Sequence, residues 1–481
     1  MGINTRKEKR LPPPAEVGGF RRIISMKMAL IGGGGVRAPE FVRGALAFAE
    51  DMDLQELWLM DNDPVRLHTM GPLCEEVVRQ ASSSLKLRYT EDLNEALRDA
   101  GMIVTTMRVG QEQGRILDER IALKHGVLGQ ETTGAGGFSM AMRSVPAILE
   151  VAALAEKLAP QAWIFNFTNP AGLVAQALHD AGYRRIVGIC DSANTAQREV
   201  ANHLSVDVDD VKSEVFGLNH LSWTRMARVK GFDVLPKLLA DDDFVQNTHL
   251  RFFGPQVVRK HRMFLNEYLY YFYFRDEALE RILDEELTRG EEVQMLNTQL
   301  FKDLQGLPPA EALAAHERYN ARRIASYMAY AEQDEDLREQ RLHPAEESIV
   351  PEQHEVGGYA GVALRAALAL SQDRPLRIGL NVPNNGAIDG MRDDDIVEVS
   401  CDVDGSGIHP VYIGAIPEDP YLLIRSVKRY ERLASQAILD RKRDLAVEAL
   451  VAHPLVGSYP VAQAIVDEYL TAHSAHVGAW S

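Results

Sequence analysis

Hydrophobic and polar positions follow two alternating patterns along the chain from Ile24 onward. The apolar run RIISMKMALIG precedes the helical pattern PEFVRGALAFA, and the run LQELWLMDND precedes a helix predicted from Pro64 to about Ser82. Further apolar runs predict strands over Met102–Thr106, Ala162–Phe167 and the segment RRIVGIC. Short apolar runs separated by helices are typical of a parallel sheet covered on both faces. The pattern predicts an α/β fold with an N-terminal Rossmann-type, doubly wound parallel sheet and a C-terminal mixed α+β substrate domain.

Polar and glycine-rich segments follow directly after these predicted strands. They are GGGGVR, DND, TTMRVG, NFTNP and CDSA. Ligands of doubly wound sheets bind beyond the carboxyl ends of the strands. We therefore expect one binding site that gathers residues from all of these segments.

The first segment predicts a dinucleotide-binding turn. In IGGGGVRAPE, Gly32 and Gly34 allow a tight turn and a close approach of a pyrophosphate to a helix N-terminus, while Arg37 stands where the usual pattern has a third glycine. Asp61 ends the next strand and could bind a ribose hydroxyl, which favours NAD over its 2'-phosphorylated form. A glycine-rich turn with a helix-capping aspartate is the simpler alternative. The predicted cofactor-binding residues are Gly32, Gly33, Gly34, Val36, Arg37, Asp61 and Asn166.

Composition and charge narrow the possible partners. The chain carries a formal net charge of -17, which repels phosphate backbones and anionic membranes, so we expect neither nucleic acid nor a membrane as partner. No later stretch reaches the ~18 uncharged apolar residues of a membrane span. The three cysteines, Cys74, Cys190 and Cys401, are too few and too scattered for a disulfide framework. They predict a reducing compartment, the cytoplasm.

A chain of 481 residues is long enough for two domains. Residues 1–25 carry basic residues and a proline run but no apolar core, so we expect a disordered tail there. Residues 26–195 are predicted to form the dinucleotide-binding domain. Residues 196–481 are predicted to form the α+β domain that supplies the substrate site.

Cys190 in GICDSA and His220 in FGLNHLSW are candidate metal ligands. Taken alone, such a cysteine is most often a small buried apolar residue, and such a histidine a satisfied core or loop residue. A thiolate and an imidazole thirty positions apart match no metal motif of the zinc-finger kind. Spacing alone leaves a packing role and a metal-binding role both open.

From around Arg108 to Pro146 the chain reads MRVGQEQGRILDERIALKHGVLGQETTGAGGFSMAMRSVP, which resembles the long signature of glycoside hydrolase family 4. The resemblance continues through IGGGG, NFTNPAG, GICDSA, FGLNHLSW, EYLYYFYFRDE, NVPNNGAI and HPLVGSYPVAQAIVDEYL. This family comprises NAD- and metal-dependent glycosidases, among them 6-phospho-glucosidases. The resemblance implies an enzyme that assembles as a homodimer or homotetramer.

The resemblance also implies a reaction that differs from hydrolysis by paired carboxylates. In the family, NAD takes hydride from sugar C3, a base removes the acidified C2 proton, the C1 substituent leaves, water adds, and the hydride returns. A divalent metal, Mn2+ in most relatives, polarises the C2 and C3 oxygens. By this resemblance Cys190 and His220 hold the metal, Tyr268 is the C2 base, and Asp191 is the general acid.

Four residues match substrate-binding positions of the family: Arg108, Asn169, Asn219 and Arg289. Arginine side chains suit the geometry of a sugar phosphate, although a solvated helix arginine is the simpler alternative for Arg289. The motif CDSA departs from the CDMP of many phospho-alpha-glucosidases and the CNVP of many phospho-beta-glucosidases. We expect a 6-phospho-beta-glucosidase, with a 6-phospho-alpha-glucosidase or a non-phosphorylated alpha-glycosidase of the same family as alternatives.

Two other classes share the predicted cofactor site. An NAD-dependent hydroxy-acid dehydrogenase would need a histidine base with an aspartate partner and no thiolate metal site, and the sequence shows no such pair. A non-catalytic NAD-binding sensor would keep its role without Cys190, His220 or Tyr268.

Overall fold

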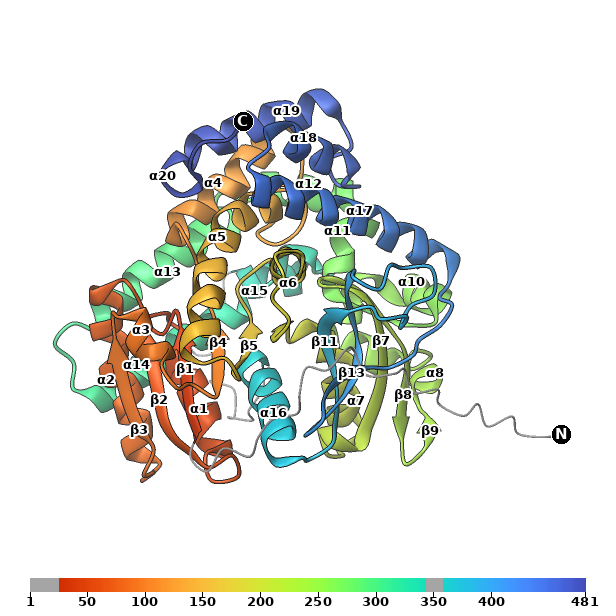
Figure 1. Cartoon of the computed structure of the whole chain (residues 1–481). Helices are drawn as coiled ribbons and strands as arrows, with labels where there is room; N and C mark the ends of the chain where they lie inside the picture. Colours follow the sequence, from red (N-terminus) through yellow and green to blue (C-terminus); the bar gives the residue numbers. More distant parts are fainter. Residues whose placement is uncertain (1–25, 343–357) are drawn as a thin grey trace.

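Two β-sheets organise the computed structural model, which describes residues 26–342 and 358–481 (Figure 1). The tail expected at residues 1–25 lies outside the described residues. Among the described residues, the larger sheet has nine strands in the order β13-β12-β11-β6-β5-β4-β1-β2-β3. The smaller sheet has four strands in this part of the chain, with β8 between β7 and β10 and β9 paired to β8.

Six neighbouring strands of the larger sheet are parallel. They are β1 (Met26–Ile31), β2 (Leu54–Met60), β3 (Lys86–Thr90), β4 (Met102–Thr105), β5 (Trp163–Asn166) and β6 (Ile186–Gly188). Their order, 3-2-1-4-5-6, is that of Rossmann-type sheets. The predicted fold class is confirmed.

The second half of the chain extends the same sheet. Strands β11 (Leu376–Pro383), β12 (Ile396–Asp404) and β13 (Gly407–Pro410) continue it in antiparallel fashion beyond β6. The smaller sheet contains β7 (Val211–Leu218), β8 (Leu221–Val229), β9 (Phe232–Asp233) and β10 (Phe264–Leu265). The larger sheet therefore contains strands from both sides of residue 195.

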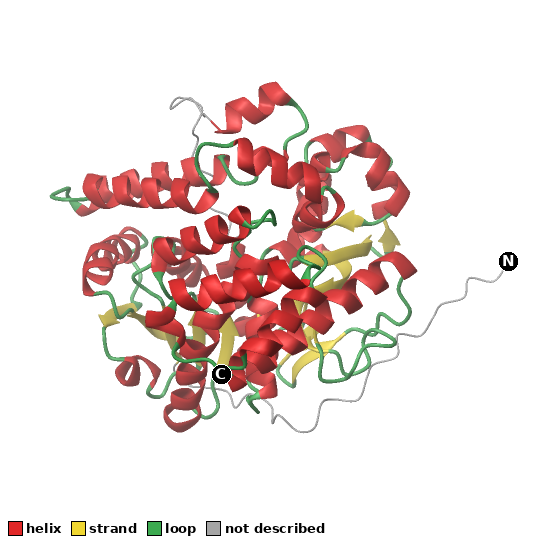
Figure 2. Cartoon of the chain, turned by 90° about the horizontal axis from the view of Figure 1, so that it is seen from above, coloured by secondary structure: helices red, strands yellow, loops and turns green. Residues whose placement is uncertain are grey.

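Helices cover both sheets, as the view from above shows (Figure 2). Those of the first half are α1 (Ala38–Phe48), α2 (Pro64–Gln80), α3 (Leu93–Leu97), α4 (Gln111–Lys124), α5 (Gly134–Leu158), α6 (Ala171–Asp180) and α7 (Thr195–Leu204). The middle segment holds α8 (Leu235–Leu238), α9 (Asp242–Gln246), α10 (Gly254–His261), α11 (Tyr270–Tyr273), α12 (Arg275–Asp284), α13 (Arg289–Asp303), α14 (Pro309–Ala325) and α15 (Glu335–Leu342). The last are α16 (Gly358–Gln372), α17 (Glu418–Asp440), α18 (Arg443–Ala452), α19 (Tyr459–Ala472) and α20 (Ser474–Val477).

One helix of the described residues, α5, is long and apolar enough to cross a membrane by length and composition. Of its most apolar window, 67% is buried inside the protein, as in the core helix of a compact fold.

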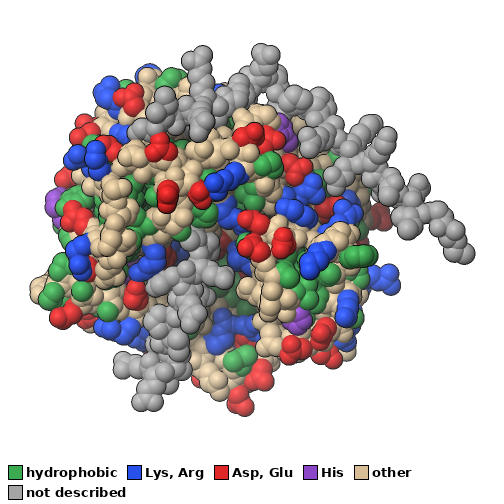
Figure 3. Space-filling model, turned by 90° about the horizontal axis from the view of Figure 1, so that it is seen from below, with side chains coloured by type: hydrophobic (Ala, Val, Ile, Leu, Met, Phe, Trp, Pro, Cys, Tyr) green, Lys and Arg blue, Asp and Glu red, His purple; other side chains and the backbone are tan. Residues whose placement is uncertain are grey.

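On the face shown in Figure 3, acidic and basic side chains lie intermixed.

A buried ion pair joins α4 and α5 and contacts His473, the residue that directly follows α19. Both terminal nitrogens of Arg143 donate to the two carboxylate oxygens of Asp118 at 2.7 Å, and His473 Nε2 lies 2.9 Å from Asp118 Oδ1. The Arg143 and Asp118 side chains are 1% and 0% exposed. Arg143 Nε also donates to the carbonyl of Val109 at 3.0 Å. The pair therefore ties the C-terminal helices to the loop that carries Arg108.

The substitution Asp118→Ala leaves Arg143 buried without its carboxylate. We expect the free energy of unfolding to fall by roughly 3–5 kcal/mol, because removing one partner of a buried pair leaves an uncompensated charge. Urea unfolding at pH 7 measures this loss. The matched control is Asp467→Asn in the exposed Arg443–Asp467 pair, which should cost less than about 1 kcal/mol. Equal losses in both variants would contradict a special role of the buried pair.

Candidate active site

A cavity of about 1540 Å³ lies at the carboxyl ends of the parallel strands. It is lined by residues that follow strands of the larger sheet by one or two positions, among them Gly32, Asp61, Thr106, Phe167 and Cys190. Pockets for one small molecule measure roughly 300–1000 Å³. This cavity therefore has room for a dinucleotide and a second ligand, and it gathers the polar segments that the sequence places after the strands.

The glycine-rich loop forms one wall of this cavity. Gly32 has φ +94°, and a Cβ atom there would lie 2.8 Å from the Thr106 carbonyl oxygen, so the turn requires glycine. Gly32, Val36 and Arg37 line the cavity. Pro39 occupies the first turn of α1, where its missing N–H costs no helical hydrogen bond.

Asp61 connects the end of β2 to this loop. Its Oδ2 accepts a hydrogen bond from Gly34 N at 3.0 Å, and its Oδ1 accepts one from Asp63 N at 3.1 Å. Burial raises the pKa of the Asp61 carboxyl above its ordinary value. Asp61 lines the cavity, where a carboxylate oxygen can still accept a further hydrogen bond.

Three predicted cofactor residues do not line the cavity. A Cβ atom on Gly33 would lie 2.7 Å from Leu59 Cβ, so this glycine serves the close packing of the loop against β2. Gly34 faces Asp61. The Asn166 amide is fully buried, accepting from Thr105 Oγ1 at 2.9 Å and donating to the Thr168 carbonyl at 3.0 Å. These residues support the walls of the cavity from behind.

The structure brings Cys190 and His220 together. Cys190 follows β6, and His220 lies in the two-residue turn between β7 and β8, with φ +61°. Cys190 Sγ lies 3.2 Å from His220 Nε2 and 3.1 Å from Ser192 Oγ. Both residues are buried, at 4% and 3% exposed, and both line the cavity. The pair thus presents a sulfur and a nitrogen donor to the same space.

Protein contacts fix the His220 imidazole. Thr132 Oγ1 lies 2.7 Å from Nδ1, which leaves Nε2 facing Cys190. Burial lowers the pKa of His220 to about 4, so the ring is neutral at pH 7. Burial, together with the nearby Asp191 carboxylate, raises the pKa of the Cys190 thiol well above its usual value. The raised pKa favours the protonated thiol, whereas a cation between the two donors would favour the thiolate.

These two side chains fit a metal site that is completed by a ligand. Within residues 26–342 and 358–481, no group of three or more His, Cys, Asp and Glu side chains could hold a metal ion. A sulfur and an imidazole nitrogen suit divalent transition metals. With two donors from the protein, the remaining coordination positions would be open to substrate oxygens and water, as in a catalytic site.

Tyr268 stacks on His220, with ring centroids 3.7 Å apart and an angle of 3° between the ring planes. Asn266 is the N-cap of the short helix that carries Tyr268, and its Oδ1 accepts a hydrogen bond from Tyr268 N at 3.0 Å. Burial and the neighbouring Glu267 raise the pKa of the Tyr268 phenol well above its ordinary value. The hydroxyl of Tyr327 donates to the Tyr268 hydroxyl at 2.8 Å and acts in the opposite direction, because it stabilises the phenolate.

The remaining predicted site residues differ in their placement. Asp191 and Asn169 line the cavity. Asn219 does not; it lies behind His220 on a separate cavity of about 20 Å³. Its Oδ1 accepts from Gly172 N at 3.4 Å, and its Nδ2 donates to Glu398 Oε1 at 3.2 Å. Asn219 therefore anchors the turn that presents His220.

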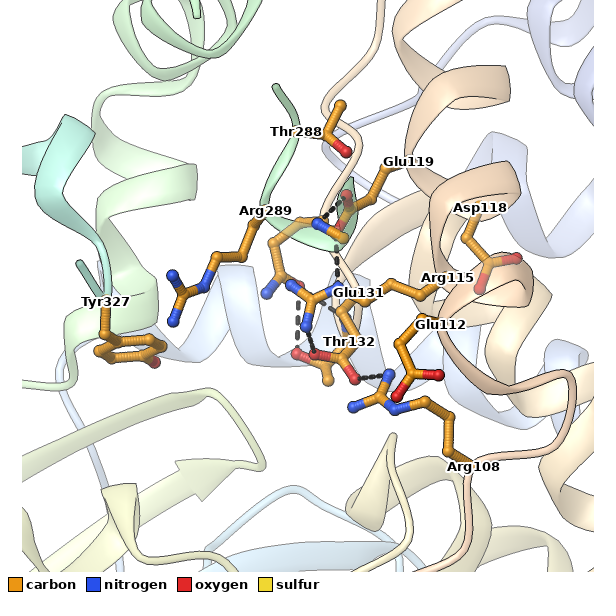
Figure 4. Close-up of polar contacts among 12 residues, drawn as sticks. Arg108, Glu112, Arg115, Asp118, Glu119, Glu131, Thr132, Thr288, Arg289 and Tyr327 are labelled. Carbon is orange, nitrogen blue, oxygen red and sulfur yellow. Dashed lines mark hydrogen bonds and ion pairs between the residues drawn. The ribbon is translucent and has the colours of Figure 1, made fainter. Parts of the chain in front are cut away.

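A chain of ion pairs leads from Arg108 to the start of α13 (Figure 4). Arg108 pairs with Glu131, whose other oxygen lies 2.8 Å from Arg115 Nη1. Arg115 Nε donates to Glu119 at 2.7 Å, and Glu119 Oε2 accepts from Gly290 N at 2.7 Å. The positive charges of Arg108 and Arg115 lower the pKa of Glu131 to about 2 despite its burial.

Arg289 faces the same cavity from the start of α13 (Figure 4). Its Nη1 donates to Glu292 at 2.6 Å and to Ser326 Oγ at 2.7 Å, and its Nη2 donates to the Arg323 carbonyl at 2.7 Å. The side chain is 18% exposed, so it is held by protein partners rather than solvated.

Sequence patterns did not reveal several residues of this site. Glu131 lies in a segment that also reads as a plain turn, and its role follows from partners that are distant in sequence. Thr132, Arg323 and Tyr327 belong to no motif that periodicity detects. Glu131 and Thr132 were signalled only through their place in the family-4-like segment.

Comparisons with known proteins identify the family of the chain. Residues 27–206 match the model of the family 4 glycosyl hydrolases, and residues 215–456 match the model of the C-terminal domain of that family. The chain is 32% identical over 467 residues to a probable 6-phospho-beta-glucosidase of Bacillus subtilis, covering 94% of this chain and 97% of that protein.

Two solved structures are similar over nearly the whole chain. A 6-phospho-beta glucosidase from Thermotoga maritima with manganese, NAD+ and glucose-6-phosphate has a TM-score of 0.78 and 28% identity, covering 94% of this chain and 99% of that one. A 6-phospho-alpha-glucosidase from gut microorganisms, in complex with NAD and glucose-6-phosphate, also has a TM-score of 0.78 and 28% identity, with 95% and 100% covered. These findings confirm the resemblance seen in the sequence.

The substitution Glu131→Gln tests the ion-pair chain. A carboxylate whose folded pKa is lowered stabilises the fold above its unfolded pKa, and this contribution is lost as the pH falls through the folded pKa. The pKa of Glu131 is about 2 instead of 4.5. We therefore expect the free energy of unfolding of the wild type to exceed that of the variant by about 3 kcal/mol at pH 7. The difference should shrink as the pH falls below about 4.5.

Urea unfolding of both proteins at a series of pH values measures this difference. The control is Glu311→Gln, an exposed residue in the first turn of α14. If the difference in the free energy of unfolding between wild type and Glu131→Gln stayed constant down to pH 3, the ion pairs would not lower the pKa of Glu131 as described.

Proposed function

The chain belongs to family 4 of the glycosyl hydrolases, and on this premise we propose that it hydrolyses 6-phospho-glucosides, with the beta anomer preferred, using NAD and a divalent metal such as Mn2+. The beta preference rests on the relative that is 32% identical. A 6-phospho-alpha-glucosidase structure is 28% identical, so the alpha anomer is the alternative within the same reaction.

One observation carries the proposal. Cys190 Sγ and His220 Nε2 lie 3.2 Å apart on the cavity that the glycine-rich loop also lines, and Tyr268 stacks on the imidazole at 3.7 Å. A thiol, a neutral imidazole and a phenol would have no common purpose in a simple packing contact. Together they supply two metal donors and one proton acceptor beside a cofactor loop.

The residues present fit both cofactors. The turn at Gly32 and the carboxylate of Asp61 suit a dinucleotide, and Cys190 and His220 suit the metal. When bound, NAD would accept hydride from sugar C3, and the metal would polarise the oxygens on C2 and C3. Bound manganese, NAD+ and glucose-6-phosphate in the Thermotoga maritima protein support this choice.

The chain's own residues perform the proton transfers of the proposed mechanism. Tyr268, as the phenolate, removes the proton from C2 and becomes the neutral phenol. The Tyr327 hydroxyl, 2.8 Å away, stabilises the phenolate form that accepts the proton. Asp191, on the same cavity, donates a proton to the departing glycosidic oxygen. Thr132 keeps the His220 ring in place through its contact with Nδ1. The positions of Arg108, Asn169 and Arg289 on the cavity favour contacts with the sugar.

The alternative of a hydroxy-acid dehydrogenase gains no support. The structure contains a buried His–Asp pair, His473 and Asp118, at 2.9 Å. However, the Asp118 carboxylate is already bound by Arg143, and neither His473 nor Asp118 lines the cavity. The pair therefore contributes to stability rather than to proton transfer.

A cytoplasmic location and assembly as a homodimer or homotetramer stay predictions.

The activity is tested with the nitrophenyl glycosides of 6-phosphoglucose. We expect release of nitrophenol from the beta 6-phosphoglucoside only when NAD+ and Mn2+ are both present, and slower release from the alpha and the non-phosphorylated compounds. Deuterium at C2 should slow the reaction, because Tyr268 breaks the C2–H bond, and solvent deuterium should enter C2. Hydrolysis without NAD+ and Mn2+, or no hydrolysis with both, would contradict the proposal.

The hydroxyl of Thr132 is expected to orient the metal-binding histidine. Loss of such a supporting hydrogen bond typically weakens metal binding by about 10–100-fold. We therefore expect Thr132→Val to need about 10–100-fold more Mn2+ for half-saturation than the wild type. Electron paramagnetic resonance of free Mn2+, with glucose 6-phosphate present, measures this binding. Thr132→Ser keeps the hydroxyl and should bind Mn2+ like the wild type. Equal Mn2+ affinities in the valine and serine variants would argue against this role.

A further inference from the structure

The Tyr268 hydroxyl makes one hydrogen bond to the part of the chain that the structure describes. Its partner is the hydroxyl of Tyr327, at 2.8 Å. The neighbouring tyrosines Tyr271 and Tyr330 join their hydroxyls to each other instead. Within the described residues, the contact with Tyr327 is therefore the one path through the protein by which a proton can leave or reach the Tyr268 oxygen.

Tyr327 reaches the cavity from the segment that follows α14. It lies two positions after the end of that helix, and both Tyr327 and Tyr268 line the cavity. Tyr327 is 39% exposed, whereas Tyr268 is partly buried and stacks on His220. Tyr327 is thus the more exposed member of the pair, which water in the cavity can reach.

Backbone contacts hold Tyr327 in place and leave its hydroxyl to Tyr268. The Tyr327 carbonyl accepts from Arg341 Nη2 at 2.7 Å. Arg289 holds the preceding turn, donating to the Ser326 hydroxyl and the Arg323 carbonyl at 2.7 Å each. In Figure 4 the Tyr327 ring lies apart from the ion-pair chain. A phenol hydroxyl both donates and accepts, so it can receive a proton on one side and release one on the other.

A bound sugar closes the direct route from Tyr268 to water. A base must come within about 3.2 Å of the group whose proton it takes, so sugar C2 occupies the space where water would otherwise contact the Tyr268 hydroxyl. The His220 ring, 3.7 Å away, covers one face of the Tyr268 ring. The hydrogen bond to Tyr327 uses a separate lone pair of the phenol oxygen and remains in place.

We propose that Tyr327 relays the C2 proton between Tyr268 and water. The inference rests on the proposed function, in which Tyr268 is the C2 base. Once the Tyr268 phenolate has taken the C2 proton, the phenol passes its proton to the Tyr327 oxygen, while Tyr327 releases its own hydroxyl proton to water. Tyr327 stays neutral, the Tyr268 phenolate is restored, and the relay transfers no electrons. The same steps in reverse bring a proton from water to C2.

The origin of the hydrogen at C2 of the product tests the relay. The holoenzyme, with NAD+ and Mn2+, hydrolyses the nitrophenyl 6-phosphoglucoside in D2O, and NMR measures deuterium at C2 of the glucose 6-phosphate formed at low conversion. We expect deuterium in most of the wild-type product. Tyr327→Phe should return mainly the substrate's own hydrogen, because the proton stays on Tyr268. A merely structural defect that slows turnover would give more time for exchange and would not lower the deuterium content.

Tyr330→Phe is the matched control, since it removes a hydroxyl from the neighbouring tyrosine pair on the same cavity. Its product should carry as much deuterium as the wild-type product. Tyr327→His replaces the hydroxyl by a ring nitrogen that can pass a proton, and should bring the deuterium content back toward that of the wild type.

Equal deuterium contents in wild type and Tyr327→Phe would overturn the inference, and so would an equally large loss in Tyr330→Phe. The proposed function fails by a different result. If deuterium at C2 of the substrate did not slow the wild type in ordinary water, removal of the C2 proton would not be part of the reaction, and the role of Tyr268 would fall together with the relay.

Discussion

The contact between Cys190 Sγ and His220 Nε2 is the interaction on which the site depends. The sulfur stands at the end of a strand of the larger sheet, whereas the imidazole stands in the turn of a hairpin in the smaller sheet. Neither sheet alone could form this pair. Residues 26–195 and the later part of the chain must therefore pack in one fixed arrangement, with β11 joining the same sheet as β6.

The hairpin turn is held from several sides. The Asn219 amide bridges the start of α6 and strand β12, through Gly172 and Glu398, and Thr132 binds the His220 ring. Thr132 directly follows Glu131, which pairs with Arg108. The segment Glu131–Thr132 thus contacts both the His220 imidazole and the ion-pair chain. This arrangement explains why polar residues are buried around the site, because each fixes a neighbour that faces the cavity.

Much of the fold could be predicted from the sequence, since the helices and buried strands of the first half have the regular apolar spacing that their burial requires. The edge strand β3 was missed, because it is partly exposed and short. The positions of Cys190, His220 and Tyr268 were predicted by family resemblance, but their closeness could not follow from spacing alone. Asn219 contacts Glu398, 179 positions away, and Arg289 contacts Arg323 and Ser326, 34 and 37 positions away, so their residue types did not reveal which protein groups hold them. Tyr327 belongs to no motif, and only its contact with the Tyr268 hydroxyl shows its place.

The central claim is that Cys190 and His220 bind one divalent metal together. Titration of the protein with Co2+ tests it most directly, because a thiolate bound to Co2+ gives a charge-transfer absorption that does not depend on turnover. We expect this absorption in the wild type and in Cys401→Ser, and its loss in Cys190→Ser, with weakened Co2+ binding in His220→Ala. An absorption that persists in Cys190→Ser, or never appears in the wild type, would contradict the account.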